Sequence, residues 1–165
     1  PHMPDPDASA VAAAFVRRWI GLAQPDPPAE ERLSAIEKTL SITLPADYRR
    51  FVLRYGTPST AWLLHSIVEG EHDLWDLAEF GRLDRLVEDT AAYEGAGMPE
   101  GYFGFASDSM GNMFLFRKAD CVAVPTRAPV WIFDHDFVTV EEIAPSFTEL
   151  LARYLEVTVV ADNGG

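Results

Sequence analysis

The stretch FASDSMGNMFLFR, residues 105–117, decides the fold expected for this chain. A polar segment, Ser107 to Asn112, separates two runs in which large aromatic residues alternate with other residues, a period typical of β-strands. The alternating aromatic residues are Phe103, Phe105, Phe114 and Phe116. Gly111 permits a positive φ angle, and the Asp108 carboxylate can accept a hydrogen bond from a backbone N–H two residues on. The stretch therefore predicts a β-hairpin with a polar turn whose first role is structural.

Helical periodicity dominates the part of the chain before this hairpin. Residues 8–23 predict a helix with Asp7 as its N-cap. The apolar side chains that recur every four residues in it are Val11, Phe15 and Trp19. A second helix is expected to begin at Pro28, because proline is favoured in the first helical turn. Its buried face is expected to consist of Leu33, Ile36 and Leu40.

A third helix is predicted by LPADYRRFVLRYG, residues 44–56. Pro45 suits the first helical position, and Gly56 suits the position after the last turn, where φ is often positive. The side chains expected to face the core are Tyr48, Phe51, Val52 and Tyr55.

Shorter segments follow Gly56. Strands are expected where runs rich in Phe, Val, Ile and Leu occur, at residues 60–68, 101–106, 112–117, 121–125 and 129–134. Helices are expected over residues 82–94 and over residues 144–156, the second beginning at Pro145. The apolar positions that indicate the first of these two are Leu83, Leu86, Val87 and Ala91. Helices that come first and strands that cluster later favour an α+β domain.

The length of 165 residues suits one domain, which we expect to span residues 8–158. Residues 1–7 are expected to be a cloning scar and a disordered start, and residues 159–165 a flexible tail. No run of 18 apolar residues and no signal peptide are visible, and the lone Cys121 fits a reducing compartment. We therefore expect a cytoplasmic protein.

The net charge of −13 is unevenly distributed along the chain. Residues 1–54 carry seven basic and seven acidic side chains, whereas residues 55–165 carry six basic and nineteen acidic ones. Nucleic acid and anionic membranes are poor partners for such a surface, because like charges repel. A basic protein would be a good partner, although an acidic surface can also serve solubility alone.

Motifs for catalysis, cofactors or metals are missing from the sequence. It has no glycine-rich phosphate loop, no G-x-S-x-G, no H-E-x-x-H and no C-x-x-C. In FDHDF, residues 133–137, neighbouring side chains of a strand point to opposite faces, which disfavours a metal site. We expect no catalytic residue, no metal and no cofactor. The alternative is a hydrolase that uses Asp108, Asp134 or His135.

The order of segments resembles the SUKH superfamily, whose members include yeast cell-wall synthesis regulators and many bacterial immunity proteins. The resemblance covers roughly residues 30–156 and leaves the first helix outside. The stretches that carry it are IEKTLSITLPADYRRFVLRYG, FASDSMGNMFLFR, PVWIFDHD and IAPSFTELLARYLE. It implies an α+β fold, with a mixed, mainly antiparallel sheet flanked by helices, to which this chain adds an N-terminal helix.

The resemblance also implies a protein without enzymatic activity. Bacterial members are thought to neutralise polymorphic toxins, often nucleases or deaminases, by binding them directly. An acidic inhibitor would suit a toxin with a basic substrate cleft, and we expect such a toxin domain as the partner. The alternative is a regulatory or scaffold module that binds an endogenous protein, as the yeast relatives suggest.

Contacts with the partner are expected first in EGEHDLWD, residues 69–76. Its candidate contact residues are Glu69, Glu71, Asp73 and Asp76. Trp75 is a candidate aromatic anchor, or else a core residue. Four residues at strand ends could extend this surface, namely Asp108, Asn112, Asp134 and Asp136.

Overall fold

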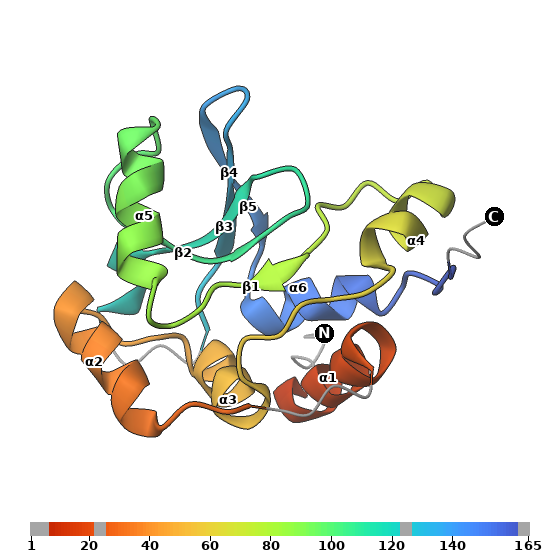
Figure 1. Ribbon diagram of the computed structural model, residues 1–165, viewed down its shortest axis with the longest axis horizontal. Helices are drawn as coiled ribbons and strands as arrows, with labels where there is room; N and C mark the ends of the chain where they lie inside the picture. The colour runs from red at the N-terminus through yellow and green to blue at the C-terminus, as the bar shows by residue number, and fades with distance from the viewer. Residues whose placement is uncertain (1–6, 22–25, 123–126, 162–165) are drawn as a thin grey trace, which may run out of the picture.

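The computed structural model describes residues 7–21, 26–122 and 127–161, and it has a single antiparallel sheet at its centre (Figure 1). The sheet consists of β1 (Glu79–Phe80), β2 (Tyr102–Ser107), β3 (Met113–Arg117), β4 (Val130–Asp134) and β5 (Thr139–Ala144). The strands lie side by side in chain order, and all four pairings between them are antiparallel. The expected α+β class is confirmed, and the sheet is antiparallel throughout the described residues rather than mixed.

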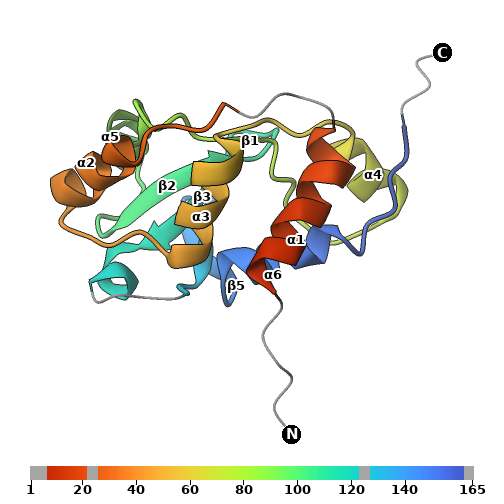
Figure 2. The same ribbon diagram turned by 90° about the horizontal axis from the view of Figure 1, so that it is seen from below.

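Helices cover both faces of this sheet. They are α1 (Ala8–Phe15), α2 (Glu30–Leu40), α3 (Ala46–Tyr55), α4 (Leu63–Glu69), α5 (Leu86–Gly95) and α6 (Phe147–Tyr154). Helices α1, α3 and α6 gather on one side of the sheet, as Figures 1 and 2 both show. Helix α5 packs on the opposite face, where its Tyr93 meets Phe133 of β4.

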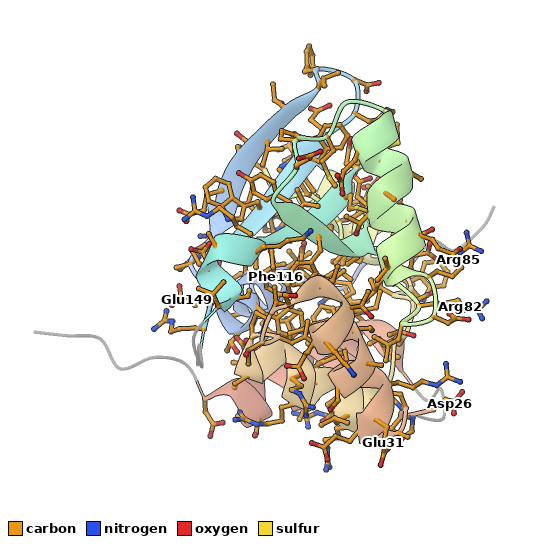
Figure 3. The ribbon with its side chains drawn as sticks, turned by 90° about the vertical axis from the view of Figure 1, so that its left-hand side faces the viewer. Asp26, Glu31, Arg82, Arg85, Phe116 and Glu149 are labelled. Atoms are coloured by element: carbon orange, nitrogen blue, oxygen red, sulfur yellow. The ribbon has the colours of Figure 1, made fainter. Side chains whose placement is uncertain are left out.

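The expected hairpin of residues 105–117 is confirmed. Ser107 pairs with Met113, and the Asp108 N–H donates to the carbonyl of Asn112 over 3.0 Å. The four alternating phenylalanines of β2 and β3 all lie in the main core. Figure 3 places one of them, Phe116, in the middle of the molecule, and its ring stacks on Phe105 with centroids 4.2 Å apart. The period of two read from the sequence therefore marks the face that α3 and α6 cover.

The first helix packs on its own domain. Phe15 is fully buried, and its ring contacts Phe51 of α3 and Tyr154 of α6. The Trp19 indole N–H donates to the Tyr154 carbonyl over 3.2 Å, from the π-helical turn Val16–Ile20 that follows α1. Residues 22–23, the end of the expected helix, lie outside the described part of the chain. The apolar face predicted for this helix, with Phe15 and Trp19, therefore packs against α6.

One expected strand is wrong, and a second is wrong in its first two residues, the only ones of it that the structure describes. Residues 60–68 were expected to be a strand, but Leu63–Glu69 form helix α4, because burial of Leu63, Ser66 and Ile67 follows helical spacing. The segment 121–125 was expected to be a strand, but Cys121 closes a 3₁₀ turn that begins at Lys118. Cys121 is nevertheless buried, and residues 123–125 lie outside the described chain.

Helix starts also differ from the expectation. Helices α2, α3 and α6 begin one or two residues after the proline that was expected to open each of them. In α6 the N-cap is Ser146, whose hydroxyl accepts a hydrogen bond from the Glu149 N–H over 3.1 Å. Asp7 is confirmed as the N-cap of α1, and Gly56 after α3 has a φ of 75°.

The buried face of α5 is shifted from the expected one. Val87 and Ala91 are exposed, whereas Leu86 and Thr90 are buried. The Thr90 hydroxyl accepts a hydrogen bond from the Gly104 N–H over 3.0 Å, which fixes the helix over β2. A polar contact, which apolar spacing does not reveal, therefore sets the rotation of this helix.

Candidate functional site

An open groove lies between the chain segment 73–75 and strand β5. Its volume is about 500 Å³. The residues that line it are Asp73, Leu74, Trp75, Glu141, Glu142, Ile143, Leu150, Arg153 and Tyr154. We call this feature the acidic groove, because three exposed carboxylates stand around it against a single guanidinium.

Strand β5 contributes two of these carboxylates because it is an edge strand. It pairs only with β4, where Glu141 lies opposite Ile132 and Glu142 lies opposite Trp131. The register shifts at the Val130 end of β4, so that Ile143 has no partner of its own there. Charged side chains and a bulge are both known to protect a sheet edge from pairing with other strands. Both glutamates are exposed, and as neighbours in a strand their side chains point to opposite faces, Glu142 to the face that Trp131 shares with Arg117.

Helix α6 forms the floor of the acidic groove and fixes its opposite wall. Tyr154 is fully buried, and its hydroxyl donates to the Trp75 carbonyl over 2.5 Å. Burial raises the pKa of Tyr154 well above its ordinary value, and the nearby Asp76 and Asp108 carboxylates raise it further. The phenol therefore remains a hydrogen-bond donor at neutral pH, and it holds the segment 73–75 in place.

The single basic side chain of the groove has an internal partner. A guanidinium nitrogen of Arg153 donates to the Ile143 carbonyl, at the bulge of β5. Arg153 thus ties α6 to the edge strand. The groove keeps an excess of negative charge, because Asp73, Glu141 and Glu142 outnumber this one cation.

The structure brings two of the expected contact residues into the acidic groove. Asp73 is exposed at its rim, and Trp75 is half-buried, packing against the main core while it lines the wall. Trp75 is therefore in part a core residue, and its role as an aromatic anchor stays a prediction. Glu69 is exposed as the last residue of α4, and Glu71 is exposed between α4 and this wall, with a φ of 54°.

Three other expected contact residues are buried and form an internal network. One Asp108 oxygen accepts hydrogen bonds from the Met110 N–H at 2.9 Å and the Asn112 N–H at 2.7 Å. The other accepts from the Asn112 side-chain amide at 2.8 Å. Asp76 accepts from the Ser109 hydroxyl at 2.5 Å. The side chains of Asp76, Asp108 and Asn112 therefore shape the hairpin turn rather than the molecular surface.

The last two expected contact residues lie in the turn between β4 and β5. One Asp134 oxygen accepts hydrogen bonds from the N–H groups of Asp136 and Phe137 at 2.9 and 3.2 Å. The Asp136 side chain is 73% exposed, and its carboxylate lies 3.6 Å from the His135 ring. Asp134 thus builds the turn, and Asp136 stands on its surface.

The sequence analysis missed Glu141 and Glu142 because it did not predict β5. The apolar residues of this strand, Val140 and Ile143, are separated by the two glutamates, so strict alternation fails. The register shift accounts for the failure, since a bulge moves one residue out of the period of two. A turn-forming DHD directly after a confirmed strand was the signal that could have indicated a returning strand.

A second hollow, of about 310 Å³, offers less to a charged partner. Its charged side chains are Asp26, Arg32, Arg82 and Asp84, two of each sign. Arg82 and Asp84 pair with each other over 2.8 Å. Figure 3 shows Asp26, Glu31 and Arg82 at one edge of the molecule. Because its charges balance, this hollow does not select a partner by charge.

The described residues hold neither a metal-binding cluster nor a membrane-spanning helix. Over residues 7–21, 26–122 and 127–161, no three His, Cys, Asp or Glu side chains are grouped closely enough to hold a metal ion. Within the same residues, every helix is too short or too polar to cross a membrane.

Comparison with known proteins identifies the family. A comparison with curated proteins found no match. The model of the SMI1/KNR4 family (SUKH-1) matches residues 27–153, which run from just before α2 into α6. The match includes every lining residue of the acidic groove except Tyr154 and leaves out α1, and it confirms the resemblance noted from the sequence. The chain belongs to the SMI1/KNR4 family (SUKH-1).

Proposed function

We propose that this chain is an immunity protein that neutralises a cognate toxin domain by binding it through the acidic groove. Membership of the SUKH-1 family supports an immunity-like role. The observation that carries the proposal is a groove whose lining includes three exposed acidic residues, Asp73, Glu141 and Glu142. The proposed activity is binding without catalysis, in the cytoplasm.

The proposed toxin is a nuclease or deaminase with a basic substrate cleft. Such a cleft is built to attract nucleic acid, so an acidic protein can occupy it and exclude the substrate. Complementary charge steers the two proteins together and can raise association rate constants to about 10⁸ M⁻¹s⁻¹ at low salt. The concentration of carboxylates after residue 54 fits this form of competition.

Purification with a toxin candidate tests the proposal. The purified chain is mixed with the toxin-like domain encoded beside its own gene, and the complex is analysed by size-exclusion chromatography with light scattering. We expect a stoichiometric complex, and loss of the toxin's nuclease or deaminase activity as the chain is added. A toxin candidate that stays active and elutes alone would contradict the proposal. A pull-down from the source organism's lysate that recovers only an endogenous, non-toxic partner would favour a regulatory module instead.

A further inference from the structure

Two hairpin turns meet at one end of the sheet and expose large apolar side chains there. Met110 belongs to the β2–β3 turn and is 69% exposed. Phe137 and Val138 belong to the β4–β5 turn and are 79% and 51% exposed. Figure 1 shows the β4–β5 turn projecting at the top of the molecule. We call these three residues the apolar tip.

The two turns form one braced unit. The Asn112 side-chain oxygen accepts a hydrogen bond from the His135 N–H over 3.0 Å. The His135 ring nitrogen Nε2 lies 2.7 Å from the Met110 carbonyl oxygen. The Tyr93 hydroxyl of α5 donates to the Gly111 carbonyl over 2.9 Å. The buried Asp108 network supports the same turn from below, so the tip is rigid before any partner arrives.

Val138 has a backbone conformation that is unusual for its residue type, and a methyl group of its side chain lies close to Gly97. Its φ is 54°, in the left-handed region that glycine and asparagine favour and that β-branched residues rarely adopt. Its side chain is half exposed, so burial does not account for a valine there. Strained backbone held by surrounding hydrogen bonds is concentrated at functional sites. Phe137 next to it is the most exposed of the large apolar side chains in the described residues.

We propose that the apolar tip is the anchor of the partner interface, and that Phe137 inserts into an apolar pocket beside a basic surface of the partner protein. This proposal rests on the proposed function and adds the part of the surface that holds the complex together. Charge argues for a basic partner, because Asp134 and the exposed Asp136 flank the tip. A second copy of this chain would bring two acidic turns together, which like-charge repulsion disfavours.

The apolar tip and the acidic groove are continuous along β5. Val138 directly precedes the strand, and Glu141 follows three residues later, which corresponds to about 10 Å at the rise of a strand. A standard interface buries roughly 800 Å² on each partner, which is enough to cover both features. The groove then supplies steering during association, and the tip supplies the buried aromatic contact that slows dissociation.

Site-specific crosslinking tests which protein meets the tip. The full chain carrying Phe137→p-benzoylphenylalanine is expressed in its source cells and irradiated. The matched control carries the same group at Val122, which is 72% exposed and follows the 3₁₀ turn at the opposite end of β3. We expect position 137 alone to capture a protein with a basic surface. A second copy of this chain, an acidic protein, no crosslink, or equal capture from both positions would overturn the proposal.

Binding by the purified captured protein then tests the anchor role. Phe137→Ala is expected to weaken affinity at least about 30-fold, mainly through faster dissociation. Val138→Gly is expected to weaken binding while the unfolding temperature stays the same or rises, because glycine relieves the positive φ. Val122→Ala should leave affinity unchanged. Unchanged affinity in both tip variants would overturn the anchor.

The two proposals fail separately. The crosslink at position 137 could capture a basic partner that is not a toxin and that the tip variants bind more weakly. This outcome would support the anchor proposal and contradict the immunity function. If the tip variants bind a toxin as tightly as the original chain does, the immunity function is supported and the anchor proposal is contradicted.

Discussion

Asp108 was a candidate for the contact surface in the sequence, but in the structure it is buried and stabilises the hairpin turn. Turn-forming chemistry correctly predicted its structural role, because Asp108 bonds the N–H of Met110 two residues on. The sequence could not show that Asp76 reaches the same turn, where it accepts a hydrogen bond from Ser109, since this contact joins segments that are far apart in the chain. The carboxylates expected at the surface were therefore divided between the interior and the groove.

Removal of the Asp108 carboxylate should destabilise the protein. Asp108→Ala leaves the Asn112 N–H and side-chain amide without their acceptor in a buried turn, which we expect to lower the free energy of unfolding by about 2–4 kcal/mol. Urea denaturation followed by tryptophan fluorescence measures this change. Asp136→Ala, at an exposed position of the neighbouring turn, is the control and should stay within about 0.5 kcal/mol. Equal effects of the two substitutions would show that the network is not structural.

The buried thiol of Cys121 makes stability depend on alkaline pH. Burial and the nearby Asp120 carboxylate raise the pKa of Cys121 to about 12, whereas an unfolded thiol titrates near about 8.5. The folded state therefore favours the protonated thiol. Its contribution is complete below the unfolded pKa and is lost as the pH rises towards the folded one. Burial raises the phenol pKa values of Tyr48 and Tyr154 as well, but an unfolded tyrosine is only half ionised at about pH 10, so each adds a smaller loss of stability below that pH.

We therefore expect stability to fall by about 2 kcal/mol between pH 8.5 and pH 10 because of Cys121. Urea denaturation at the two pH values measures the fall. Cys121→Ala should show a correspondingly smaller fall over the same range, although it is less stable at both pH values. The same pH dependence in the two proteins would contradict the raised pKa.

At the scale of elements, the sequence predicted those segments whose local pattern and packing agree. Helices α1, α2, α3 and α6 and strands β2, β3 and β4 were found, because periodic apolar positions coincide with buried faces. Helix α4 was mistaken for a strand, since a short apolar run does not distinguish the two. Strand β5 was missed because a bulge interrupts its alternation. Two of the three acidic residues of the groove were therefore not predicted either.

Helix α1 should be integral to the domain although it lies outside the family match. Phe15→Ala removes a ring that contacts Phe51 and Tyr154, and we expect a loss of about 3–5 kcal/mol in the free energy of unfolding. Chemical denaturation measures it. Arg17→Ala, at an exposed position just after α1, is the control, with an expected change of at most about 0.5 kcal/mol. A small effect of Phe15→Ala would mean that α1 is an independent appendage.

At the scale of the whole molecule, the acidic groove and the apolar tip both lie along one edge of the sheet. Strand β5 connects the acidic groove to the apolar tip, and the segment 73–75 forms the facing wall. The sequence revealed the charge excess but not its placement, because placement follows from β5 being an edge strand. The account therefore assigns recognition to this edge rather than to the net charge as a whole.

The facing wall offers one charge-reversal test. Glu71→Lys combined with Asp73→Lys should weaken binding of the toxin domain mainly by slowing association, because both side chains are exposed beside the acidic groove. Stopped-flow fluorescence gives the association rate constant, and surface plasmon resonance gives the dissociation rate constant. If affinity and its salt dependence match those of the original chain, this wall does not contribute to steering.

The most direct test of the central claim reverses the charges of β5 itself. The association rate constant with the toxin domain is measured at low and at physiological salt for the original chain, for Glu141→Lys combined with Glu142→Lys, and for Glu100→Lys as an exposed control. The account predicts that the β5 variant associates at least about tenfold more slowly at low salt, with a weaker salt dependence, while the control changes little. Equal association rates for the β5 variant and the original chain at both salt concentrations would contradict the assignment of the acidic groove as the recognition surface.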